Sequence, residues 1–173
     1  MKKKDILVFE IISFFIISVL GVLFHFLYEW IGGNFIGSFT AINESIWEHL
    51  KLLFFPTVLT IVIGGIYLKD YKNYITVKTR GLFLGMAFIV VFYYTYTGII
   101  GNRFAFLDIG SFFVASFILE LYTLKNINSD KYYNNYLYSY ILIITTTLFI
   151  IFTFSPPKIN LFKDPVNNTY GIK

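Results

Sequence analysis

Residues 43–68, NESIWEHLKLLFFPTVLTIVIGGIYL, combine the feature that decides the fold with the feature that locates the candidate site. The second part, residues 52–68, is an apolar run long enough to enter a lipid bilayer. Directly before it, four ionisable side chains fall within eight residues: Glu44, Glu48, His49 and Lys51. Such groups cost several kcal/mol at membrane depth unless they are paired or hydrated. We therefore expect the protein to use them.

Four further apolar segments of similar length accompany this run and predict an all-α fold, a polytopic membrane helical bundle. Each is close to the roughly 20 residues that a helix needs to cross about 30 Å of hydrocarbon. Backbone polar groups in lipid must be satisfied within the segment, which favours helices, and the strict alternation of a membrane β-strand is absent. The expected helices cover residues 6–28, 46–68, 81–100, 107–124 and 136–155, and residues 1–155 form the transmembrane domain.

The composition agrees with a membrane protein. The 173 residues are 57% hydrophobic and 14% charged, whereas a soluble domain carries roughly a quarter charged residues. The chain has no cysteine, which excludes disulfides, a thiolate nucleophile and cysteine-bound metal. The net charge of +4 arises from lysines that flank apolar segments, and no basic patch with interleaved aromatics lies outside them. Membrane lipids are therefore the expected partners, and no nucleic acid is expected.

The distribution of basic residues predicts the orientation in the cell membrane. If five helices cross, one side receives Lys2, Lys3, Lys4, Lys69, Lys72, Lys78, Arg80, Lys125 and Lys131. The other side receives Glu29 and Glu44 in its first loop and Arg103 in its second. The positive-inside rule therefore predicts a cytoplasmic N-terminus and an outer C-terminal tail. The first apolar segment is too long for a signal peptide and lacks a small-residue cleavage site, so we expect a retained helix.

This topology gathers polar residues, among them both histidines of the chain, at the outer end of the helices. The candidate site comprises His25, Glu29, Asn43, Glu44, Ser45, Glu48, His49, Lys51, Asn102 and Asp108. Neutral imidazole with carboxylate is a reasonable ligand set for Zn²⁺ or Mn²⁺. The expected ligands are His25, Glu48, His49 and Asp108, and the expected cofactor is a divalent metal such as zinc.

Helical spacing suggests pairs within this site, and each has a purely structural alternative. Residues i and i+4 share a helix face, so Glu44 is expected beside Glu48, and Ser45 beside His49. The second pair fits a nucleophile and its base, although any helix with this spacing would match. Lys51 follows Glu48 by three residues and is equally well explained as its ion-pair partner at the membrane surface. Asn43 or Thr40 is the expected helix cap.

Residues outside the candidate site are interpreted structurally. Trp47 is expected as an interfacial anchor. Glu10 and Glu120 are expected near the inner helix ends, either at the interface or paired with lysines. The C-terminal tail, residues 156–173, begins with two prolines but is too apolar for a disordered segment, so we expect it to pack on the outer face, as a lid over the site.

Several sequence motifs of this chain resemble those of an uncharacterised family of small multi-pass membrane proteins of low-GC Gram-positive bacteria. The specific part is NESIWEHLK at residues 43–51, and HFLYE at 25–29, Pro56 and LFKDPVNNTYG at 161–171 accompany it. The resemblance covers the whole chain and implies a fold and a location. A looser likeness is to the ceramidase-like membrane hydrolases, which bind zinc in a seven-helix bundle. Their Ser-x-x-x-His is matched by Ser45 and His49, but their His-x-x-x-His on the last helix has no counterpart here.

Two functions from different classes follow. The first is an integral membrane protein whose outward-facing cluster of histidines and carboxylates binds a ligand or an ion. The alternative is a membrane-embedded, metal-dependent hydrolase of lipid-like substrates, in which Glu44 or Glu48 activates a metal-bound water. Measuring the metal content of the purified protein is the simplest way to distinguish these two functions.

Overall fold

Each of the five apolar segments forms a helix, because a backbone in apolar surroundings satisfies its N–H and C=O groups only within itself. The computed structural model describes residues 3–68, 70–129 and 134–172. Across these residues it is all-helical, and five helices are long and apolar enough to cross a membrane. These helices are α1 (Lys3–Ile31), α3 (Ile46–Tyr67), α4 (Tyr74–Ile100), α5 (Ala105–Asn126) and α6 (Asn135–Phe154). The predicted fold class is confirmed.

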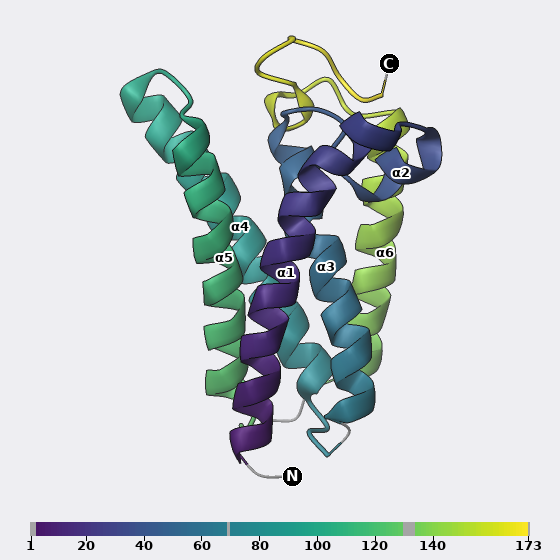
Figure 1. Ribbon diagram of the computed structural model, residues 1–173, viewed down its shortest axis with the longest axis vertical. Helices are drawn as coiled ribbons and strands as arrows, with labels where there is room; N and C mark the ends of the chain where they lie inside the picture. Colours follow the sequence, from purple (N-terminus) through teal and green to yellow (C-terminus); the bar gives the residue numbers. More distant parts are fainter. Residues whose placement is uncertain (1–2, 69, 130–133, 173) are drawn as a thin grey trace.

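Two short elements lie outside the long helices. The helix α2 (Asn34–Phe39) separates α1 from α3, and the 3₁₀ turn η1 (Asn160–Phe162) follows α6. Both lie at the end of the bundle that carries the C-terminus, whereas the N-terminus lies at the opposite end (Figure 1).

The helix α4 begins at Tyr74, seven residues before the expected start at Gly81. Lys78 and Arg80 therefore lie inside a helix and not in a loop. The helix can begin early because Lys78 is buried against two carboxylates, which offsets the cost of burying its charge. Lys2, Lys69 and Lys131, also counted for the orientation, lie outside the described residues.

Small residues allow α4 and α5 to pack closely. A Cβ atom at Gly81 would lie 2.8 Å from the carbonyl oxygen of Leu119, and one at Gly85 would lie 2.9 Å from that of Ala115. Gly81 and Gly85 are one turn apart, which is the spacing of the small-residue motif that brings membrane helices together. Toward the end that carries α2, the α4–α5 hairpin leans away from α1 (Figure 1).

The C-terminal tail packs on α3 and α6. The ring of Trp47 lies 4.8 Å from that of Phe162 in the tail and 4.6 Å from that of Phe149 in α6. The backbone N–H of Ile172 donates to the carbonyl of Thr153. Trp47 is thus half-buried beneath the tail and does not face outward as the interfacial anchor that its position near a helix end suggests.

Candidate functional site

Two side chains fix the start of α3 and thereby the position of Glu44. The Oδ1 atom of Asn43 accepts a hydrogen bond from the N–H of Ser45 at 2.9 Å. Ser45 is the N-cap, and its hydroxyl accepts from the N–H of Glu48 at 3.4 Å. Glu44 therefore precedes the helix, so the predicted pairing of Glu44 with Glu48 on one face is wrong. The predicted cap, Asn43 or Thr40, is also wrong.

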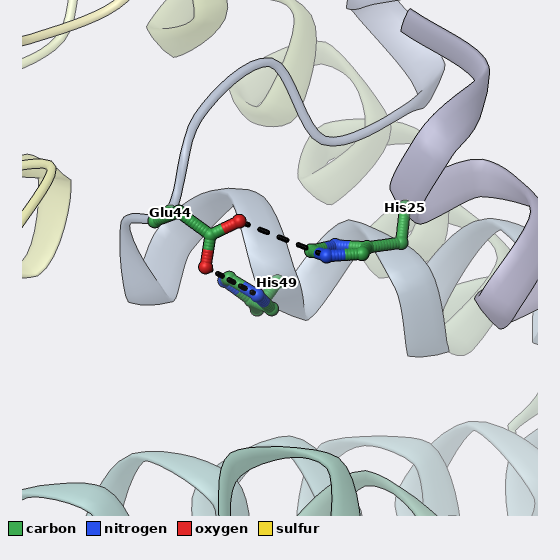
Figure 2. Close-up of side chains that lie close together, drawn as sticks. All are labelled: His25, Glu44 and His49. Atoms are coloured by element: carbon green, nitrogen blue, oxygen red, sulfur yellow. Dashed lines mark ion pairs between the residues drawn. The ribbon is translucent and has the colours of Figure 1, made fainter. Parts of the chain in front are cut away.

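The two histidines converge on Glu44. His25 comes from α1 and His49 from α3, and the Glu44 carboxylate points between their rings (Figure 2). Oε1 of Glu44 lies 3.7 Å from Nε2 of His25, and Oε2 lies 3.8 Å from Nε2 of His49. The ring centroids are 5.3 Å apart. These three residues, which we call the His25–Glu44–His49 cluster, each offer one ligand atom, and these atoms all lie within 4.8 Å of one another.

The backbone sets the tautomer of His49. Its Nδ1 atom lies 2.9 Å from the carbonyl oxygen of Ser45. A carbonyl only accepts, so Nδ1 donates to it, and Nε2 is the ring nitrogen that faces Glu44 and remains available to a metal. Proteins commonly orient a metal-binding histidine in this way, by a hydrogen bond from the ring nitrogen that does not bind the metal. The Nδ1 atom of His25 is buried, and no partner for it lies in the part of the chain that the structure describes.

Arg103, in the turn between α4 and α5, contacts the carboxylate of the cluster. Its Nη2 donates to Oε2 of Glu44 at 2.8 Å, and its Nε lies 3.6 Å from Oδ2 of Asp108. Burial raises the pKa of the Glu44 carboxyl, but the hydrogen bond from Arg103 and the two imidazoles lower it by more, so this pKa lies below its ordinary value. Burial lowers the pKa of the Arg103 guanidinium, and the bond to Glu44 with the charge of Asp108 raises it above its ordinary value. Both groups are therefore charged at neutral pH.

A cavity of about 360 Å³ adjoins the cluster between α1, the start of α3 and the start of α5. His25, Glu44, His49, Arg103 and Asp108 supply its polar wall. The rest is apolar and includes Gly21, Val22, Phe26, Leu52, Ala105, Ile109 and Phe112. A polar group set at one wall of an apolar cavity is the usual form of a small-molecule site.

Glu48 and Lys51 form a separate buried pair and do not join the cluster. Lys51 Nζ lies 2.7 Å from Oε2 of Glu48, and both side chains are almost fully enclosed. The same ammonium donates to the carbonyl of Gly37 and to the hydroxyl of Thr153, and Glu48 accepts from the N–H of Ile42. The carboxylate between the imidazoles is thus Glu44 and not Glu48, because Glu48 points inward from the first turn of α3.

The remaining predicted residues divide into three kinds. Asp108 borders the cavity and is held by Arg103 and by the hydroxyl of Tyr96. Asn43 and Ser45 shape the helix start, and the Ser45 hydroxyl is engaged as the cap and does not face His49 as a nucleophile would. Glu29 and Asn102 are exposed.

Arg103 and Tyr96 are absent from the predicted site, although the sequence holds a signal for Arg103. It is the only basic residue that the predicted topology places in the two outer loops, where Glu29 and Glu44 also lie. An arginine in that position pairs readily with a carboxylate. Tyr96 resembles the neighbouring tyrosines Tyr93 and Tyr94, and nothing in its sequence position distinguishes it.

The fold and the site define a small helical protein with five helices of membrane-crossing length and a cluster of two histidines and a carboxylate at one end. The chain belongs to a family of unknown function, DUF6512, whose model matches residues 1–172. No curated protein and no solved structure matches it. The prediction that one uncharacterised family covers the whole chain is confirmed, while the range of that family among bacteria stays a prediction.

Proposed function

We propose that this chain is an integral membrane protein that binds a divalent metal ion, zinc being the best chemical match, at His25, Glu44 and His49. The observation that carries the proposal is the convergence of three ligand atoms within 4.8 Å. Two imidazoles and one carboxylate are the protein ligands of a zinc site that keeps a fourth position open. Ligands about 2.1 Å from a tetrahedral zinc ion lie about 3.4 Å apart, so the side chains must draw together by up to about 1.4 Å to hold the ion.

The groups around the cluster support the same function. The carbonyl of Ser45 fixes the His49 tautomer that binds metal, and the low pKa of Glu44 keeps this ligand ionised. Arg103 bonds one oxygen of Glu44 and leaves the other directed at His25. A bound cation would also offset the two carboxylates, Glu44 and Asp108, which face only one guanidinium there.

Metal content tests this proposal. Detergent-purified protein, equilibrated with zinc and then desalted, is expected to retain about one ion per chain. His25→Ala and His49→Ala each remove one of three ligands, so we expect zinc affinity to fall by more than the roughly 10–100-fold that loss of an outer-shell partner costs. Elemental analysis and zinc titration measure this.

Glu29→Gln is the matched control, because Glu29 lies one helical turn after His25 but is exposed. It should bind zinc as the wild type does. Absence of zinc from the wild type, or equal losses in Glu29→Gln and His25→Ala, would contradict a metal site at the cluster.

The cavity favours a second candidate function, metal-dependent hydrolysis of lipid-like substrates. An apolar space of about 360 Å³ would accept a hydrocarbon segment with its polar group at the cluster. A metal at the cluster would supply an activated water there. Zinc-dependent release of fatty acid from phospholipid or ceramide vesicles, lost in His49→Ala, would support the hydrolase, and zinc binding without release would leave a binding protein.

The proposed orientation places the N-terminus in the cytoplasm and the cluster outside, in contact with membrane lipids. Lys72, in the turn between α3 and α4, and Lys125, in the last turn of α5, are exposed at the end of the bundle where the chain begins. At the other end Glu44 neutralises Arg103, and the tail lysines Lys158 and Lys163 lie in a segment that also carries Asp164. This asymmetry supports the positive-inside assignment even without Lys78.

Single cysteines in this cysteine-free chain test the orientation. Asn34→Cys, on the exposed start of α2, is expected to react with a membrane-impermeant thiol reagent on intact cells. Asn73→Cys, before α4, is expected to react only after the cells are permeabilised. The reverse pattern would place the His25–Glu44–His49 cluster in the cytoplasm.

A further inference from the structure

A second cluster of ionisable side chains lies inside the bundle, away from the proposed metal site. Lys78 of α4 contacts Glu10 of α1 and Glu120 of α5. The side chains of Lys78 and Glu10 are fully enclosed, and that of Glu120 is 6% exposed. Glu10 precedes His25 by fifteen residues on one helix, which separates the two clusters by about 22 Å along the axis of α1.

The charges of this cluster do not cancel. Two carboxylates and one ammonium sum to one net negative charge if all three are ionised. Tyr74 of α4 is a further titratable group beside them, and its hydroxyl lies close to Glu10 as well as to the carbonyl oxygen of Thr60 in α3. A tyrosine hydroxyl is neutral and cannot compensate the excess. An uncompensated charge enclosed in apolar surroundings is strongly unfavourable, so one group is expected to neutralise.

The hydrogen bonds show which atoms could carry the missing proton. Lys78 contacts the Oε2 atom of each glutamate. The Oε1 atoms of Glu10 and Glu120 are both buried, and neither has a partner among the described residues. The two carboxyl groups are nevertheless neighbours, because the Oε2 atoms of both contact the same Lys78 ammonium. A proton on one of them would supply the donor that the other lacks, as in carboxylate pairs that share a site.

We propose that Glu10 and Glu120 hold one proton between them, so that the cluster is neutral as a carboxylic acid, a carboxylate and an ammonium. The ligand of this site is therefore a proton, and binding and release form and break one O–H bond without any co-reactant. Paired ionisable groups inside membrane helices are the elements from which proton relays are built. The hydroxyls of Ser13, one turn after Glu10, and of Thr79, next to Lys78, are also buried without a partner in the described chain. A hydroxyl both donates and accepts, which is what passing a proton requires.

Infrared spectroscopy tests the proposal on the detergent-purified protein at neutral pH. The wild type is expected to show the C=O stretch of a protonated carboxylic acid, which shifts in D₂O. Glu10→Gln and Glu120→Gln should each abolish this band, because either leaves one carboxylate paired with Lys78 and no need for the proton. Glu29→Gln, which alters an exposed carboxylate, should leave the band unchanged.

Aspartate variants cover the case in which a glutamine variant does not fold. Glu120→Asp retains a carboxyl group and should shift the band rather than remove it. A wild-type spectrum without the band, or a band that neither the glutamine nor the aspartate substitutions alter, overturns the shared proton.

Discussion

The substitution Lys51→Met is expected to lower the free energy of unfolding by about 3–5 kcal/mol, because it leaves the Glu48 carboxylate enclosed without its cation. The Lys51 side chain is completely buried, and its ammonium lies 2.7 Å from Glu48. It also donates to the carbonyl of Gly37 in α2 and to the hydroxyl of Thr153 in α6. One charge therefore joins three parts of the bundle. Unfolding of the detergent-purified variant by heat or denaturant measures the loss.

Two further variants make this prediction specific to the buried pair. Lys72→Met removes an exposed ammonium and should change stability by no more than about 0.5 kcal/mol. Adding Glu48→Gln to Lys51→Met should cost less than the sum of the single losses, because the orphaned carboxylate is then absent. If Lys51→Met were as stable as Lys72→Met, the ammonium would not be the link between α3, α6 and the segment before α3.

Hydrophobic run length was sufficient to predict the five long helices, but it placed the start of α4 seven residues late. The pattern before Gly81 contains Lys78 and Arg80, which are typical of a loop at the membrane surface. Lys78 is instead enclosed because Glu10 and Glu120 meet it from two other helices. Such compensation depends on contacts between residues that are far apart in the sequence, by 68 positions for Glu10 and Lys78 and by 42 for Lys78 and Glu120. A local pattern contains no information about these contacts.

The candidate site could be predicted in composition but not in detail. Both histidines fall at one level of the predicted topology, and the structure brings their rings within 5.3 Å. The sequence predicts Glu48 as the ligand between them because both histidines and the paired carboxylates Glu44 and Glu48 are expected at one depth of the bundle. Ser45 caps the helix, and this places Glu44 outside it while Glu48 turns inward to Lys51. Ser45 and Glu48, three residues later, match the capping-box pattern that marks the start of a helix. The sequence alone therefore contained the information needed to place Glu44 before the helix.

The close contact of α4 and α5 gives the second large effect. Gly85→Leu is expected to destabilise the protein by about 3 kcal/mol or more, because the new Cβ would lie 2.9 Å from the carbonyl oxygen of Ala115 and 3.2 Å from the Leu53 side chain. A backbone oxygen cannot turn aside, so the two helices must separate. Unfolding in detergent measures the loss. Arg103 lies in the turn that joins these helices, and we expect separation to weaken its bond to Glu44 as well.

Gly98→Leu is the matched control on the same helix, since a Cβ atom there meets nothing within 4 Å. Leucine is the better helix former by up to about 1 kcal/mol, so this variant should be as stable as the wild type or slightly more stable. Both variants replace glycine by leucine in α4, but only Gly85 lies against α5. Comparing their stabilities therefore separates the effect of the contact with α5 from the effect of the residue change itself. Equal losses at the two positions would mean that glycine serves α4 through backbone flexibility and not through its approach to α5. Loss at Gly85 alone would identify its close approach to the backbone of α5 as the reason that α4 carries glycine there.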